Sequence, residues 1–160
     1  MVEVEEQAWV STERGNHLRG RVTRNTRPEI ALRKAVHALG LRFRLHRAVA
    51  PRCTPDFILP RWHVAVFVDG CYWHGCPQHG VREFRGPNAQ LWREKITANQ
   101  ARDSRNTRAA QDAGWLVIRI WECEVRKDPG AAAQRVRSAA LGQEASSDAT
   151  ASDQKSWERD

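Results

Sequence analysis

The chain has 160 residues and a formal net charge of +7, a length that suits one domain able to bury a core without disulfide or metal support. The positive surplus is carried mainly by arginine, whose planar guanidinium group suits phosphate, so a polyanionic partner is expected. The N-terminus is acidic and no apolar run reaches about 20 residues, so we expect neither a signal peptide nor a membrane span and predict a cytoplasmic protein. Its four cysteines are then expected to bind metal or be buried, because disulfides are rare in that compartment.

Composition divides the chain into three parts. Residues 1–18 are polar and aperiodic and are expected to be flexible, whereas residues 19–127 carry the periodic apolar pattern of a folded domain. Residues 128–160 begin with an Ala-rich stretch that we expect to be helical, and the Ser-rich and Asp-rich tail after about residue 142 is expected to be disordered.

The folded part predicts an alternation of helices and strands. Thr26 and Pro28 are typical of a helix start, and Gly40 of a helix end. In chain order the expected elements are a helix over 29–39, strands over 41–45, 55–59 and 63–68, a helix over 88–113 and a strand over 115–121. Pro60 and Arg61 form the turn between the second and third strands.

A basic segment covers residues 13–47, where arginines far outnumber acidic residues. We expect this segment, including Arg19, Arg21 and Arg24, to contact the phosphate backbone of DNA. The alternative for an Arg-rich stretch is an ordinary solvated helix surface, and charge alone does not decide between the two.

Three residues suggest a nuclease centre. Asp56 begins one predicted strand and Asp69 ends the adjacent one, so a hairpin would bring both carboxylates to one edge of the sheet. Two such groups can hold Mg²⁺, which activates phosphodiester hydrolysis. His74 follows closely, and its side chain suits general acid or base catalysis near neutral pH. A Pro-Asp pair and an Asp-Gly turn are each common by chance, and it is the neighbouring histidine that favours a site.

The same loop contains Cys71, Cys76 and His79 in a C-x4-C-x2-H pattern, and Cys123 follows the last strand. Together they can form a Cys₃His zinc site that fixes the loop to that strand. The alternative for Cys123 is a buried thiol without a metal. Cys53 has no ligand-like spacing and is expected to be structural.

Aromatic residues form the third feature of this region. Tyr72 and Trp73 lie beside His74 in a polar loop, and Trp92 lies in the long predicted helix. Flat side chains of this kind can wedge between bases and bend a duplex. The alternative, burial in the core, suits Trp115 and Trp121 in their apolar strand better than it suits Tyr72 and Trp73.

Taken together, these motifs resemble the very short patch repair (Vsr) DNA mismatch endonucleases over roughly residues 17–127. The matching segments are 26–29, 43–46, 55–56, 68–76, 91–96, 102–103 and 114–123. The resemblance implies an α/β domain with a restriction-endonuclease-like (PD-(D/E)XK-type) mixed sheet flanked by helices, and a structural zinc. It also implies Mg²⁺-dependent nicking on the 5′ side of the thymine in a T:G mismatch, the product of 5-methylcytosine deamination.

The resemblance further implies roles for individual residues. Asp56 matches the metal-binding aspartate, His74 the catalytic histidine, Asp103 the acidic residue that supports this histidine, and Glu29 a helix glutamate near the centre. The residues that match the base-inserting aromatics and the zinc ligands are Tyr72, Trp73, Trp92, Cys71, Cys76, His79 and Cys123.

Two positions depart from the best-known family pattern. Val68 and Asp69 replace Thr-His, so the Val68 backbone carbonyl and the Asp69 carboxylate are the expected metal ligands there. The loop from Gly75 to His79 is shorter than the usual His-rich run, which makes His79 the zinc ligand that the pattern supports least.

We therefore expect a monomeric endonuclease with catalytic Mg²⁺ and structural Zn²⁺, associated with the nucleoid when bound to DNA. Its partners would be mismatched duplex DNA, mismatch-repair proteins and a cognate cytosine methyltransferase system. Two alternatives stay open: a nicking enzyme of broader or restriction-associated specificity, and a non-catalytic zinc-stabilised DNA-binding module.

Overall fold

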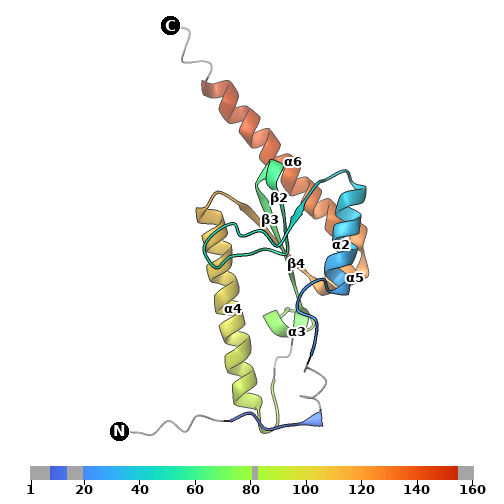
Figure 1. Ribbon diagram of the computed structural model, residues 1–160, viewed down its shortest axis with the longest axis vertical. Coiled ribbons are helices and arrows are strands. Elements are labelled where there is room, and N and C mark those ends of the chain that lie inside the picture. The colour runs from blue at the N-terminus through green and yellow to red at the C-terminus, as the bar shows by residue number, and fades with distance from the viewer. Residues whose placement is uncertain (1–7, 14–19, 81–82, 155–160) are drawn as a thin grey trace, which may run out of the picture.

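The computed structural model describes residues 8–13, 20–80 and 83–154, and these form one α/β domain of three layers. A four-stranded mixed sheet has helix α4 (Ala89–Asp112) on one side and helices α2 (Arg27–Ala38), α5 (Glu122–Lys127) and α6 (Pro129–Gln154) on the other (Figure 1). The predicted single domain with a mixed sheet flanked by helices is confirmed.

The strands lie in the order β1-β2-β3-β4, with β2 pairing antiparallel to β1 and β3, and β4 pairing parallel to β3. Their bounds are β1 Arg44–Leu45, β2 Phe57–Leu59, β3 Val64–Asp69 and β4 Leu116–Trp121. The short 3₁₀ helix η1 (Pro60–Trp62) joins β2 to β3, and α4 makes the long crossover that a parallel pair requires.

Helix α2 begins as the sequence predicts. The Thr26 side chain accepts a hydrogen bond from the Glu29 N–H, and the Glu29 carboxylate accepts one from the Asn25 N–H. Two otherwise unpaired backbone donors are thereby satisfied. Leu32 and Val36 then face the main core, which also includes Phe57 and residues of α6. Glu29 itself is buried at the start of this helix.

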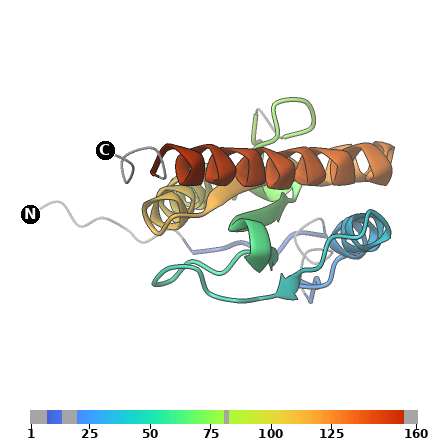
Figure 2. The same cartoon turned by 90° about the horizontal axis from the view of Figure 1, so that it is seen from above.

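Alternation along β3 and β4 separates the two faces of the sheet. Val66 and Ile120 belong to the core beneath α2 and α6, whereas Phe67 packs with Ala110 of α4 on the opposite face. Figure 2 shows α6 running along one side of the molecule, with α2 beside the end at which α6 begins. Arg119 shares the α4 face with Phe67, its partner in the register of the two strands.

Four elements differ from expectation. The strand predicted over 41–45 is reduced to β1, whose two residues pair with Phe57 and Ile58 of β2. The loop after β3 contains the short helix α3 (Cys71–His74), and α5 follows β4 directly. Helix α6 continues to Gln154, beyond residue 142, where we had expected disorder; its first half packs through Ala133 and Val136, and Glu144 forms an ion pair with Arg61 at 3.0 Å.

No helix in the described parts of the chain has both the length and the apolar composition of a membrane span.

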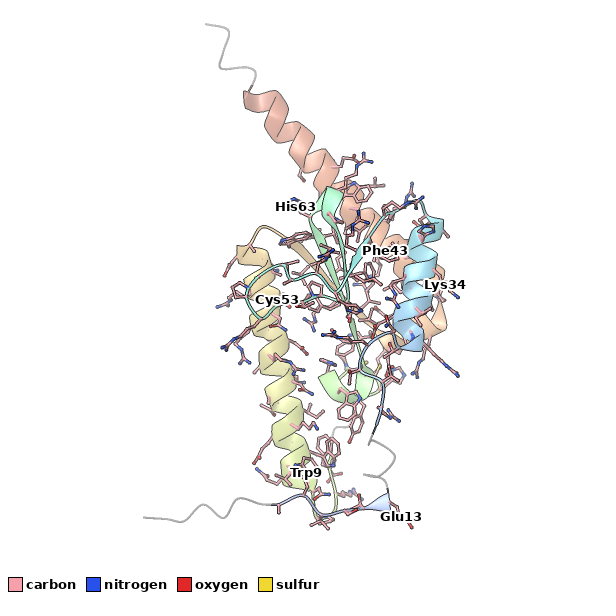
Figure 3. All side chains as sticks on the ribbon, viewed as in Figure 1. Trp9, Glu13, Lys34, Phe43, Cys53 and His63 are labelled. Atoms are coloured by element: carbon pink, nitrogen blue, oxygen red, sulfur yellow. The ribbon has the colours of Figure 1, made fainter. Side chains whose placement is uncertain are left out.

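Residues 8–13 lie against the start of α4, although we had expected residues 1–18 to be flexible. Asn88 precedes the helix but makes no side-chain cap; its amide instead accepts from the Val10 N–H at 2.9 Å and donates to the Val10 carbonyl at 2.7 Å. Trp9 packs edge-on against Trp92, with ring centroids 5.0 Å apart. Figure 3 shows Trp9 at this end of α4.

Asn88→Ala should release this segment, because it removes two hydrogen bonds of about 1 kcal/mol each. We expect amide hydrogen exchange at Val10 to accelerate roughly tenfold or more in the Asn88→Ala variant. Asn99→Ala is the matched control, since Asn99 lies on the same helix but donates to the Trp73 carbonyl. Equal exchange rates at Val10 in both variants and the wild type would show that the Asn88 amide does not hold the segment.

Candidate active site

The site lies where β2 begins and β3 ends. Asp56 precedes β2, and its carboxylate accepts the Val68 N–H of β3 at 2.7 Å, while its own N–H donates to the Val66 carbonyl. Asp69 is the last residue of β3, and α3 starts after Gly70. The antiparallel pairing thus brings Asp56 and Asp69 to one edge of the sheet, as the hairpin prediction required.

Asp56 occupies a negatively charged environment. Burial and the nearby Glu29 and Asp69 carboxylates together raise the pKa of its carboxyl group to about 6, although the hydrogen bond from Val68 and the charge of Arg119 lower it. Glu29 therefore lies close enough to act on Asp56, although its oxygens are bonded to Thr26 and Asn25 at the start of α2. These surroundings disfavour the ionised form of Asp56, and a bound cation would stabilise it.

Asp69 is paired with a residue that the sequence reasoning missed. Arg119 of β4 donates from Nε and Nη2 to the two carboxylate oxygens of Asp69, both at 2.7 Å. The available signal was a single charged residue within an otherwise apolar strand, at a position that alternation places on the α4 face. A metal ion at Asp69 would have to compete with this bidentate ion pair.

His74 and Asp103 form the second part of the site. His74 ends α3, and its Nδ1 lies 2.5 Å from Oδ2 of Asp103 on α4 and 3.9 Å from Oδ1 of Asp69. Although burial acts in the opposite direction, the bond to His74 and the charge of Arg119 lower the pKa of Asp103. An ionised Asp103 can only accept a hydrogen bond, so Nδ1 of His74 is the donor and Nε2 is left for chemistry.

The structure brings the candidate site residues together. The ligand atoms of Asp69, His74 and Asp103 all lie within 4.8 Å of one another, and Asp56 and Glu29 act on the same region through their charge. A histidine whose far nitrogen is free, beside an acidic site short of positive charge, can activate water for attack on a phosphodiester.

A second cluster joins α3 to the end of β4. The ligand atoms of Cys71, Cys76, His79 and Cys123 also lie within 4.8 Å of one another, and the Cys76 and Cys123 sulfurs are 3.9 Å apart. In tetrahedral coordination with metal–sulfur bonds of about 2.3 Å, two cysteine sulfurs lie roughly 3.8 Å apart. The spacing in this cluster therefore fits a tetrahedrally coordinated metal ion. His79, the ligand that the sequence pattern supported least, lies within the cluster.

Two features make this cluster ready for a cation. The N–H groups of Gln78 and His79 lower the pKa of the Cys76 thiol although burial raises it, which favours the thiolate. Glu122 accepts the Cys71 N–H at 3.0 Å and so ties the start of α5 to α3. Cys53 lies elsewhere, with its thiol directed at the Asn106 carbonyl, in agreement with its expected structural role.

The three predicted aromatic residues form one cluster. Tyr72 and Trp73 contact each other and Trp92, with ring centroids between 5.1 and 5.8 Å apart. The Lys95 ammonium group lies 5.5 Å from the centres of both the Trp73 and Trp92 rings, a contact that we did not predict. Because α3 carries Tyr72, Trp73 and His74, two of the three rings lie within one helical turn of the histidine, and α4 supplies the third ring.

Arg21 and Arg24 are exposed in the segment before α2, where they are free to contact phosphate. Arg19 lies outside the described residues.

Sequence comparison finds relatives of this chain among DNA-cutting enzymes. A sequence model described as DNA mismatch endonuclease Vsr matches residues 8–79. The chain is 44% identical over 131 residues to the type II nicking enzyme V.XorIIP of Xanthomonas oryzae pv. oryzae, covering 80% of this chain and 93% of the relative. It is 40% identical over 118 residues to the type II nicking enzyme V.NmeDIP of Neisseria meningitidis serogroup C, covering 73% and 78%.

The DNA mismatch endonuclease Vsr of Escherichia coli K12 is 35% identical over 115 residues, covering 71% of each chain. These relatives share names for enzymes that cut DNA, and the first of them aligns over nearly its whole length. The resemblance inferred from the motifs is confirmed: this chain belongs to the Vsr family of DNA mismatch endonucleases.

Proposed function

We propose that the protein nicks one strand of duplex DNA on the 5′ side of the thymine in a T:G mismatch, by Mg²⁺-dependent hydrolysis. The observation that carries this proposal is the His74–Asp103 pair beside the Asp56 edge of the sheet, with two rings of the aromatic cluster on the same short helix as His74. The cytoplasmic location and monomeric state expected from the sequence belong to the same proposal.

Asp56 and the Val68 carbonyl are the residues we propose to hold Mg²⁺, in a region where Glu29 and Asp69 add negative charge. When bound there, the ion would orient water and neutralise charge on the scissile phosphate. The sequence also predicts Asp69 as a ligand, but both its oxygens already accept hydrogen bonds from Arg119, so we leave it out of the proposed metal site. The surroundings of Asp56 support the fit, because a cation would offset both the burial and the carboxylate repulsion that raise its pKa.

His74 serves as the general base in this mechanism. Asp103 fixes Nδ1 as the donor, so the lone pair on Nε2 accepts the proton of the attacking water, and the resulting imidazolium is stabilised by the adjacent carboxylate. As the water oxygen bonds to phosphorus, the bond from phosphorus to the leaving sugar oxygen breaks, and that oxygen takes a proton from solvent water while the His74 ring stays hydrogen-bonded to Asp103.

Recognition of the mismatch is assigned to the aromatic cluster and the basic segment. Tyr72, Trp73 and Trp92 would insert at the weakly stacked mispair, because opening a mismatch costs less than opening a matched pair. Arg21 and Arg24, together with Arg19 outside the described residues, would bind the backbone. Lys95 adds positive charge beside the rings.

Zn²⁺ is the ion we propose for the Cys71, Cys76, His79 and Cys123 cluster, because thiolate and imidazole donors in a tetrahedral set are what zinc prefers. Its role would be structural. It would fix α3, which carries His74, Tyr72 and Trp73, to the end of β4.

The test of the function uses purified protein, Mg²⁺ and a panel of matched and mismatched duplexes, with each nick mapped to its strand. We expect a single nick 5′ of the thymine in T:G. His74→Ala should reduce the rate about 100-fold to 10,000-fold, the usual contribution of a general base, and Asp56→Asn should abolish detectable cleavage. Asp112→Asn, at the exposed end of α4, is the control and should cleave normally.

Undiminished cleavage by His74→Ala or Asp56→Asn would refute the assigned roles. Cleavage of other mismatches at similar rates would point to the broader specificity, and DNA that binds but stays intact in Mg²⁺ would point to the non-catalytic module.

The zinc proposal predicts one Zn²⁺ per chain by elemental mass spectrometry. Cys76→Ser should lower the zinc content and the melting temperature, because a structural zinc contributes directly to folding. Cys53→Ser removes a thiol outside the cluster and should keep the full zinc content. Equal zinc content in the two variants would mean that the metal is not bound at this cluster.

A further inference from the structure

We propose that Arg119 is a positioning residue of the active site, which fixes His74 by holding the two carboxylates on either side of it, and that Asp69 serves as the partner of Arg119 and not as a metal ligand. This inference rests on the proposed function, and it assigns a role to a residue that has none in that mechanism so far.

The contacts of Arg119 reach two elements at once. Besides the bidentate pair with Asp69 of β3, Nη2 lies 3.1 Å from Oδ1 of Asp103 on α4. Nη1 donates to the Thr107 hydroxyl at 3.2 Å and to the Asp103 carbonyl at 3.4 Å. The guanidinium plane rests over the Phe67 ring, with 4.6 Å from its central carbon to the ring centre. A planar group with this many fixed partners has little freedom to rotate.

The position of Asp103 depends on these contacts because few residues of α4 near it are buried. The buried residues of α4 are Ile96 and Ala110, and none of the residues between them, all of which the structure describes, is fully buried. Asp103 lies in this stretch, so apolar packing does little to fix its distance from the sheet. Arg119 links this stretch of α4 to β4 at the level of His74.

Charge balance explains the pairing with Asp69. A buried carboxylate without a partner is costly, and Asp69 is only 5% exposed. Arg119 satisfies both its oxygens with the fork geometry that a lysine cannot reproduce. The carboxylate that a metal ion could use most freely at this edge is then that of Asp56, whose hydrogen bond from Val68 occupies one oxygen.

The first test compares steady-state nicking by Arg119→Lys, Asp69→Asn and Asp56→Asn. Arg119→Lys keeps the charge but loses the fork, so kcat should fall about 100-fold while KM for DNA stays within about twofold, because misplacing a catalytic group slows the chemical step. Asp69→Asn should be much less impaired than Asp56→Asn. Arg137→Lys, exposed on α6, should match the wild type.

The second test is thermal unfolding without added Mg²⁺. Arg119→Met leaves Asp69 buried and unpaired and should lower the melting temperature by roughly 10 °C, and adding Asp69→Asn should restore at least half of this loss. If adding Asp69→Asn does not raise the melting temperature of Arg119→Met, the pairing of the two residues is overturned. Wild-type kcat in Arg119→Lys would overturn the positioning role, and equal losses in Asp69→Asn and Asp56→Asn would overturn the role of Asp69.

The two tests separate this inference from the proposed function. If the wild-type protein nicks no duplex, the proposed function fails, whereas the unfolding experiment still reports whether Asp69 and Arg119 depend on each other. If the wild type nicks DNA and Arg119→Lys does so equally well, only the positioning role fails.

Discussion

β3 and β4 run parallel, with Asp69 opposite Trp121, and the chain leaves both strands at the same edge of the sheet. Helix α3 begins directly after β3 and helix α5 directly after β4, so Cys71 and Cys123 meet although they are far apart in the sequence. The same register puts Arg119 within reach of Asp69. Both the cysteine cluster and the catalytic cluster therefore follow from the pairing of two strands.

Electrostatics then defines what each part of the edge can do. Glu29, Asp56, Asp69 and Asp103 bring four carboxylates to one region, and Arg119 forms ion pairs with Asp69 and Asp103. Arg119 neutralises one side, where His74 is held, and leaves the surroundings of Asp56 negative. The site is thus divided into a region that orients a base and a region that can accept a cation.

Much of this arrangement could be predicted from local patterns. Asp56, Asp69 and His74 were found because strand ends and their order in the chain place them at one edge, and the Cys/His spacing indicated the second cluster. The cap at Thr26 and the helix that follows it were likewise read from residues next to each other. Each of these inferences needs only the chain direction and the periodicity of one element.

The missed features depend on contacts between distant elements. Arg119 was read as part of an apolar strand, because only the packing of α4 shows that its side chain meets Asp103 and Thr107. Residues 8–13 contain no periodic signal, and their position is set by Asn88, which lies far along the chain. Helix α6 extends beyond residue 142 because alanine has a high helix propensity and Glu144 forms an ion pair with Arg61.

The central claim is that Asp103, held by Arg119, makes Nδ1 of His74 a donor and leaves Nε2 free to accept a proton. The most direct measurement is the ¹⁵N chemical shift of the two ring nitrogens of His74 in the neutral imidazole, by nuclear magnetic resonance of the isotope-labelled protein. We predict a protonated Nδ1 and an unprotonated Nε2. A hydrogen found on Nε2, with Nδ1 unprotonated, would contradict the account.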